Sequence, residues 1–382
     1  MTKISDKSTD SADTLFAQAG GFLDPHTGGV VPPLQPATTF ARADDYSLVS
    51  EGHLYARDHN DLVRLAEKIL CEAEGAEEGL LFGSGMAAIA ALIRSVPNGG
   101  RIVLQSGIYW GTTKFIREFC ERRGIDLLEL DCSDMRALEE ATQSIQADLL
   151  WTETPSNPYL KTVDIAACAK IADRIGAKLA VDSTAATPML TQPIKHGAHF
   201  VMHSATKAIN GHSDVLAGFI CAKSSDEPVW NFIKSERAGG GAVLGPFEAW
   251  LLIRGMRTLP LRIERMSDSA LKIANAMTGH PKVHTVLYPG LVDDPGHSTA
   301  QRQMDTGFGS LLSIQVEGGS ERALKVAGKL NLFKRATSLG GVESLVEHRH
   351  SIEDTVPDDL LRLSVGIESA DDLIADLEQA LG

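Results

Sequence analysis

The strongest constraint on the fold is a regular alternation of strand-like and helix-like patterns between residues 61 and 204. Short apolar runs alternate with longer amphipathic stretches, which are typical of strands and helices respectively. This alternation indicates a mostly parallel sheet covered by helices, and it places the chain in the α/β class. The expected strands are residues 78–82, 101–105, 126–130, 147–153, 178–183 and 199–204, and the expected helices are residues 61–75, 85–96, 113–124, 135–145 and 165–176.

The pattern differs at both ends of the chain. Residues 20–60 are rich in Gly and Pro and show little periodicity, which predicts an extended arm rather than a core element. Residues 246–277 form a long helical stretch, followed by the strand-like SLLSIQVEG, two further helices and a closing strand, LLRLSVGIE. We therefore predict an N-terminal arm (1–60), a large α/β domain (61–245) and a smaller α+β domain (246–382).

Charge and cysteine content limit the classes of partner. The 382-residue chain has a formal net charge of -14, which disfavours broad binding to nucleic acid or anionic membranes. Its five cysteines include no CxxC pair, as expected in a reducing compartment. The N-terminal sequence has no apolar signal-peptide core, and the longest mostly apolar run, residues 79–93, is too short to span a bilayer. We predict a cytoplasmic protein without membrane or nucleic-acid partners.

Polar or Gly-rich loops follow five of the expected strands: GSGMAA, SGIYWGT, TPSNP, STAATP and SATK. Ligands of open α/β sheets bind outside the carboxyl ends of the strands, so we expect these loops to gather at one edge. GSGMAA, residues 83–88, opens an apolar helix whose first N–H groups attract phosphate. It is not a Walker motif, because no GK[ST] follows. Ser204 and Thr206 offer hydroxyl groups to the same anion.

Four further side chains in these loops suggest a cofactor. Lys207 is either a solvated loop lysine or an amine nucleophile in an enclosed site. Asp182 ends an apolar run, where a carboxylate must be paired or must cap a helix. Together with the ring of Tyr109 and the amide of Asn157, they match the needs of pyridoxal 5'-phosphate (PLP). The amine forms a Schiff base, the acid keeps the ring nitrogen protonated, and the aromatic ring stacks on the pyridine.

Two competing motifs have weaker support. SATK, residues 204–207, matches the SxxK of penicillin-recognising serine enzymes, but the chain has neither KTG nor SDN. EHRH, residues 347–350, has metal-binding residue types at a spacing that fits no zinc motif, so we interpret it as a solvated polar turn and predict no metal.

The motifs also resemble a known family over nearly the whole chain. SGMAAI, ETPSNP, HSATKAINGHSD, LIRGMRTLPLR, YPGL, SLGGVESLVEH and RLSVGIE occur in the order found in the transsulfuration family of PLP-dependent enzymes. That family includes cystathionine gamma-synthase, cystathionine gamma- and beta-lyase, methionine gamma-lyase and homoserine-ester sulfhydrylases. The resemblance implies the aspartate-aminotransferase-like fold (fold type I), PLP as cofactor, and a homotetramer built from two dimers.

The resemblance also assigns roles to individual residues. Lys207 would be the Schiff-base lysine and acid–base group, Asp182 would pair with the pyridine nitrogen, and Tyr109 would stack on the ring and assist proton transfer. Arg362 would bind the substrate α-carboxylate, although on sequence alone it could instead pair with a surface acid such as Asp358 or Asp359. The other implied contacts are Gly85, Met86, Ser204 and Thr206 at the phosphate, Thr184 elsewhere on the cofactor, Asn157 at the ring hydroxyl, Ser338 beside the substrate, and Tyr55 and Arg57 reaching the phosphate from a neighbouring subunit.

Several positions depart from the family pattern. The arm reads YARDHNDL where YSRxxNPT is usual, and the stacking motif reads YWGT instead of YGGT. Gly111 occupies the place of a cysteine in methionine gamma-lyases, and Lys114 that of an arginine in cystathionine enzymes. Leu54 and Thr337 stand where cystathionine enzymes tend to carry acids that suit the distal ammonium group. We infer a pocket for a substrate whose far end lacks an ammonium group.

The sequence therefore predicts a PLP-dependent lyase or transferase of sulfur amino-acid metabolism. Its reaction would be γ-elimination or γ-replacement on a sulfur amino acid or an O-acylhomoserine, the latter with a small thiol as possible co-substrate. Alternatives are a C–S β-lyase, a methionine gamma-lyase, or a catalytically weak binding or assembly protein on the same fold.

Overall fold

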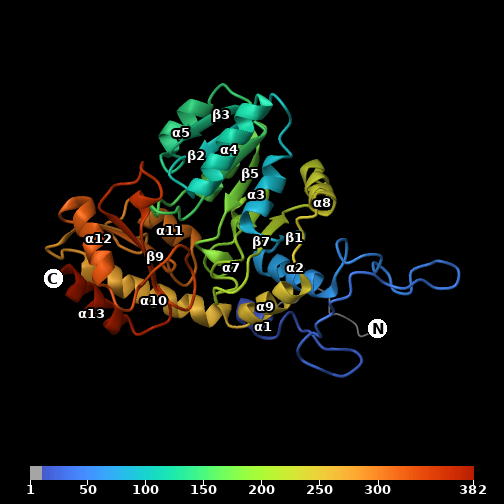
Figure 1. Cartoon of the computed structure of the whole chain (residues 1–382). Helices are drawn as coiled ribbons and strands as arrows, with labels where there is room; N and C mark the ends of the chain where they lie inside the picture. The colour runs from blue at the N-terminus through green and yellow to red at the C-terminus, as the bar shows by residue number, and fades with distance from the viewer. Residues whose placement is uncertain (1–10) are drawn as a thin grey trace.

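The computed structural model describes residues 11–382 and contains a seven-stranded and a five-stranded sheet. Figure 1 shows most of the larger sheet in teal and green, with covering helices that range from blue (α2) to yellow (α8 and α9), beside the C-terminal elements in orange and red. The first ten residues of the predicted arm lie outside the described part of the chain.

The larger sheet has the order β1-β7-β6-β5-β4-β2-β3 and is parallel except for β7, which runs antiparallel to both of its neighbours. All six expected strands are present, so the prediction of a mostly parallel sheet is confirmed. The sequence analysis missed β7. The strands are β1 (Glu78–Phe82), β2 (Arg101–Gln105), β3 (Asp126–Leu130), β4 (Leu149–Glu153), β5 (Lys178–Asp182), β6 (Phe200–His203) and β7 (Gly218–Ala222).

Helices cover both faces of this sheet. Neighbouring residues on a strand point to opposite faces, so Leu150 packs in one apolar core while Trp151 packs in the other. One core also holds residues of α2, α5, α6 and α9, and the other holds residues of α3, α4 and α8. The helices are α2 (Asp61–Glu74), α3 (Gly85–Ile93), α4 (Trp110–Arg123), α5 (Met135–Thr142), α6 (Ile165–Arg174), α7 (Thr187–Leu190), η1 (Pro193–His196), α8 (Pro228–Gly240) and α9 (Pro246–Met256).

Helix ends follow from capping residues that can be recognised in the sequence. Asn60 accepts a hydrogen bond from Leu62 N–H and begins α2, and Gly75 ends it in the left-handed conformation. The predicted long helical stretch is divided into α9 and α10 (Leu259–Met277). Pro260 falls in the first turn of α10, where its missing N–H breaks no helical hydrogen bond.

The second sheet has the order β10-β11-β12-β9-β8 and packs with α10, α12 and α13 around a separate apolar core. The expectation of two helices between SLLSIQVEG and the closing strand was wrong. One α-helix, α12, lies between β9 and β12, and the next, α13, follows β12. The remaining elements are β8 (Val283–Leu287), α11 (His297–Gln303), β9 (Leu311–Val316), α12 (Gly319–Lys329), β10 (Lys334–Arg335), β11 (Leu345–His348), η2 (Arg349–Ser351), β12 (Leu360–Ser364) and α13 (Ala370–Leu381).

The N-terminal segment is extended, as the Gly and Pro content predicts. After the short helix α1 (Ala12–Ala17), the chain as far as residue 60 contains two isolated β-bridges, Thr39 with Tyr55 and Arg42 with Leu48. Figure 1 shows this segment as blue loops that project from the rest of the molecule. In the part of the chain described, no helix is both long and apolar enough to cross a membrane.

Candidate active site

A cavity of about 240 Å³ lies at the carboxyl ends of the parallel strands, where the polar loops were expected to gather. Its wall also includes residues from the C-terminal part of the chain. Twelve of the predicted site residues line it: Gly85, Met86, Tyr109, Asn157, Asp182, Thr184, Ser204, Thr206, Lys207, Thr337, Ser338 and Arg362. The predicted residues Leu54, Tyr55, Arg57 and Lys114 do not line this cavity of their own chain.

Lys207 reaches into this cavity from the turn after β6. Its Nζ donates a hydrogen bond to Ser338 Oγ at 2.9 Å. Burial and, to a smaller extent, the nearby Arg362 charge lower the pKa of Lys207 to about 8, while the Glu347 charge opposes the shift. Ser338 itself has a φ of 117°, a conformation that costs a non-glycine residue about 1–3 kcal/mol and is concentrated at functional sites. The structure therefore holds a readily deprotonated amine in a defined position.

Two buried carboxylates lie side by side at the ends of neighbouring strands. Asp182 on β5 pairs in register with Glu153 on β4. Burial raises the pKa of Asp182, while the N–H and side chain of Thr184 oppose the shift. Burial and the charge of Asp182 also raise the pKa of Glu153, which accepts hydrogen bonds from the N–H groups of Tyr109 (3.1 Å) and Asn157 (2.7 Å). The sequence analysis missed Glu153, which orients these two predicted site residues.

The start of α3 forms part of the cavity wall. Ser84 caps this nine-residue helix by accepting from Ala87 N–H, which leaves the other first-turn N–H groups available to an anion. A Cβ atom on Gly85 would come within 2.9 Å of Ser204 Oγ, so only glycine allows this close approach. Thr184 Oγ1 accepts from Ser204 N–H, whereas the Thr206 hydroxyl is bonded to the backbone of Ala217.

Tyr109 precedes α4 and presents a half-buried ring to the cavity. Burial raises the pKa of its hydroxyl group. Gly111 lies against this ring, because a Cβ atom there would come within 2.6 Å of Tyr109 Cε1. The glycine at this position therefore allows the ring to lie where it does.

Arg362 lies on β12 and is 97% buried, with hydrogen bonds to Asn157 Oδ1 (3.1 Å) and to the carbonyl of Ser338 (2.8 Å). It does not pair with Asp358 or Asp359. Its ionic partner is Glu347 on β11, at 2.8 Å. Burial lowers the pKa of Arg362 to about 10, and Glu347 opposes the shift.

The interpretation of EHRH as a solvated turn was wrong. Glu347 is buried on β11, which lies inside the second sheet between β10 and β12, and Arg349 is buried at the start of η2, directly after β11. Arg349 Nη1 donates to Glu347 Oε2 at 2.8 Å, so one carboxylate is shared by Arg349 and Arg362. Within residues 11–382, the Nε atoms of both arginines lack a hydrogen-bond acceptor. Arg349 lines the cavity and is a second site residue that the sequence analysis missed.

Comparisons with known proteins agree with this arrangement. The family model described as Cys/Met metabolism PLP-dependent enzyme matches residues 13–382. The chain belongs to this family. It is 40% identical over 378 residues to a cystathionine gamma-synthase of Mycobacterium bovis, covering 97% of this chain and 96% of the relative. It is 37% identical over 382 residues to a cystathionine gamma-lyase of Bacillus subtilis, covering 96% and 98%.

A solved structure gives the same result for the fold. The crystal structure of cystathionine gamma synthase from Xanthomonas oryzae pv. oryzae, in complex with aminoacrylate and cysteine, superposes with a TM-score of 0.93. The two chains are 34% identical, and the match covers 98% of each. The predictions of fold type I, of the transsulfuration family and of a PLP-dependent enzyme are thus confirmed.

The residues of the cavity fit the family's cofactor. The glycine at the start of α3 leaves room for a phosphate, and the lowered pKa of Lys207 suits attack on an aldehyde. Asp182 is a buried carboxylate with a raised pKa, and a protonated ring nitrogen would stabilise its ionised form. Lys207, Asp182, Tyr109 and the first turn of α3 are therefore the groups that would hold PLP.

Proposed function

We propose that this enzyme catalyses γ-elimination or γ-replacement on a sulfur amino acid or an O-acylhomoserine. The observation that carries the proposal is the enclosure of Lys207, Asp182, Tyr109 and Arg362 in one cavity. It combines a base, an acid partner for the cofactor, a stacking ring and a carboxylate-binding group. When bound, PLP supplies an electron sink for the negative charge that develops on the substrate.

Arg362 would orient the substrate by binding its α-carboxylate as a bidentate fork. Asn157 and the Ser338 carbonyl fix the guanidinium group, and its unpaired Nε leaves a donor for the incoming carboxylate. Glu347 is paired with both Arg362 Nη2 and Arg349 Nη1. When the substrate carboxylate displaces Glu347 from Arg362, the Glu347 carboxylate would remain paired with Arg349.

Lys207 would then move the protons of the reaction. A base works best when its pKa is near the operating pH, and burial brings Lys207 towards that range. It would take the α-proton, and loss of a γ-substituent requires removal of a β-proton as well. The hydrogen bond to Ser338 holds Nζ on the cavity side between these steps. Tyr109 would stack on the cofactor and assist proton transfer.

The far end of the substrate is expected to lack an ammonium group. Thr337, which lines the cavity, and Leu54 on the arm both lack the negative charge that would bind an ammonium group. Arg349, a cationic group that lines the same cavity, disfavours an ammonium and tolerates an acyl carboxylate. Methionine gamma-lyase activity is a weaker candidate, because Gly111 stands where methionine gamma-lyases tend to carry a cysteine.

The predicted homotetramer, the thiol co-substrate and the cytoplasmic location belong to this proposal. Exposed apolar side chains on the arm, including Tyr46 (81% exposed) and Val49 (71% exposed), support its packing against another subunit. Tyr55 and Arg57 on this arm are expected to reach the phosphate of a neighbouring subunit. All five cysteines are buried and unpaired, which supports a reducing compartment.

A substrate panel tests the proposal. Purified holoenzyme is incubated with cystathionine, methionine, homocysteine, cysteine, and O-acetyl- and O-succinylhomoserine, each with and without a thiol. We expect 2-oxobutyrate from a homoserine ester, with a thioether replacing it when thiol is added. Pyruvate from cystathionine would instead indicate β-elimination. The absence of any oxoacid or thioether above the level of the Lys207→Ala control would contradict the proposal.

A further inference from the structure

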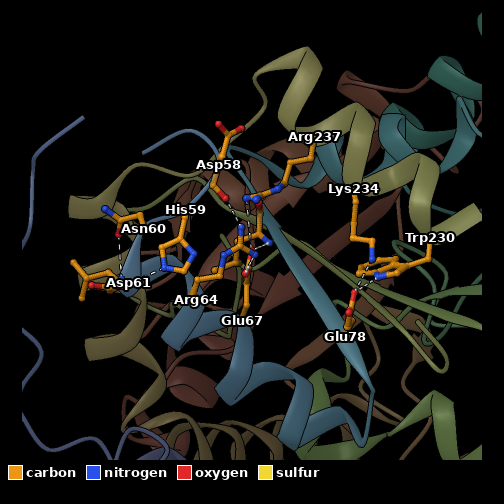
Figure 2. A network of polar contacts seen from close by, with 12 residues as sticks. Asp58, His59, Asn60, Asp61, Arg64, Glu67, Glu78, Trp230, Lys234 and Arg237 are labelled. Atoms are coloured by element: carbon orange, nitrogen blue, oxygen red, sulfur yellow. Dashed lines mark hydrogen bonds and ion pairs between the residues drawn. The ribbon is translucent and has the colours of Figure 1, made fainter. Parts of the chain in front are cut away.

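Two histidines and an aspartate converge where the extended arm meets α2. His53 Nε2 lies 3.1 Å from Asp61 Oδ1, and His59 Nε2 lies 3.2 Å from the same oxygen. The ligand-type atoms of the three side chains all lie within 4.8 Å of one another. Figure 2 shows His59 facing Asp61 beside the first turn of α2. His59 and Asp61 fall in the YARDHND departure from the family pattern, residues 55–61, and His53 stands two residues before it. The proposed reaction does not explain this departure.

The spacing of these atoms fits a small transition-metal ion. Four ligands around Zn²⁺, with bonds of about 2.0–2.1 Å, place their donor atoms roughly 3.3 Å apart. The two His–Asp distances are close to this value, so only small side-chain rotations would be needed to close the set around one ion. The histidines have five residues between them, within the His-x3–5-His range of zinc motifs.

The hydrogen bonds of His53 orient its ring as a ligand. Its Nδ1 lies 3.1 Å from the carbonyl oxygen of Glu51, which can only accept, so Nδ1 carries the proton. In the neutral ring, Nε2 therefore presents a lone pair towards the Asp61 carboxylate. Two acceptors that face each other need a cation or a proton between them. A backbone carbonyl bonded to the other ring nitrogen is also the usual support of a metal-binding histidine.

The loop between the histidines is anchored without an ion. Arg64 donates to the carbonyl of Asp58 at 2.7 Å and pairs with the buried Glu67 at 2.6 Å (Figure 2). Glu67 in turn accepts from the N–H of Leu81 in the sheet. Asp61 lies in the first turn of α2, so the helix fixes its position beside the two histidines. The ligands are thus largely positioned in advance.

We propose that His53, His59 and Asp61 bind a zinc-like divalent ion, with one coordination position left open. The bound ion would link residues 53–61 into one rigid unit. Tyr55 and Arg57 lie between the two histidines, so the ion would fix the part of the arm that presents them. An effect of the ion on catalysis rests on the proposed function, in which Tyr55 and Arg57 contact the phosphate of a neighbouring subunit. Metal binding itself does not depend on that function.

Calorimetric titration of chelator-treated holoenzyme with Zn²⁺ tests the site. We expect the wild type to bind one equivalent of Zn²⁺ per chain. In His53→Ala and Asp61→Asn the Zn²⁺ affinity should fall by more than about tenfold, since even losing a residue that only orients a ligand lowers metal affinity about 10- to 100-fold. His26→Ala is the matched control, an exposed histidine of the same arm, and should bind Zn²⁺ as the wild type does.

Hydrogen–deuterium exchange separates this site from other zinc-binding positions. Zn²⁺ should slow exchange in residues 53–61 of the wild type and of His26→Ala, but not in the two ligand variants. Unchanged exchange in this segment, or wild-type Zn²⁺ affinity in both ligand variants, would overturn the proposal. Both measurements are independent of turnover, so they hold even if the proposed reaction is wrong.

Discussion

Glu347 is the shared counter-charge of two buried arginines, and its removal should have a large effect. Its Oε2 lies 2.8 Å from both Arg349 Nη1 and Arg362 Nη2, and the three side chains are 6%, 1% and 3% exposed respectively. Glu347→Gln keeps the size of the side chain but leaves two guanidinium charges without their common partner. Breaking a buried ion pair from one side costs about 3–5 kcal/mol, so we expect a loss of that size in the free energy of unfolding.

Chemical denaturation at fixed protein and PLP concentrations measures this loss. The matched control is Glu129→Gln, which breaks the surface pair with Arg117 at 2.8 Å. Such an exposed pair contributes about 0–1 kcal/mol. Adding Arg349→Met to Glu347→Gln removes one of the two charges that have lost Glu347 and should recover part of the stability. The reasoning fails if Glu347→Gln loses no more stability than Glu129→Gln.

Four further predictions concern the cavity. Lys207→Ala should abolish turnover while leaving the circular dichroism spectrum unchanged; normal activity would exclude the proposed base. Because the pKa of Lys207 is lowered to about 8, its neutral fraction at pH 7 is ~9% instead of ~0.03% for an ordinary lysine. Labelling of the apoenzyme at Lys207 by an amine reagent should therefore rise with pH through a midpoint near 8; a midpoint near 10.5 would refute this. Thr337→Glu should raise kcat/KM for cystathionine relative to O-acylhomoserine, and an unchanged ratio would remove our account of the distal pocket. Gly111→Ala should lower kcat by displacing the Tyr109 ring, whereas Gly99→Ala, at an exposed turn away from the cavity, should not.

The sequence predicted those parts of the fold that depend on local pattern. The six expected strands and the loops at their carboxyl ends follow from apolar periodicity and from the rule that ligands bind at that edge of an open sheet. β7 was missed because its pattern, GFICA, carries no sign that it inserts antiparallel between β1 and β6. The separation of α9 from α10 was missed because the residues of both helices have helical periodicity.

The missed site residues depend on contacts between distant segments. Arg349 follows a short polar stretch that suggests solvent exposure, yet it is 99% buried. Its burial is possible because β11 pairs with β12 in a register that sets Glu347 opposite Arg362, and no local pattern encodes that pairing. Glu153 was visible as the last residue of an apolar strand, a signal that was used for Asp182 and could have been used here as well.

The central claim of this account is that Lys207 holds the cofactor and moves the protons of the reaction. Borohydride reduction of the holoenzyme fixes PLP to the lysine that carries it, and peptide mass spectrometry then identifies that residue. We predict that the cofactor mass is found on the peptide containing Lys207 and is absent from Lys207→Ala. Attachment to another lysine, or no attachment in an enzyme that turns over substrate, would contradict the account.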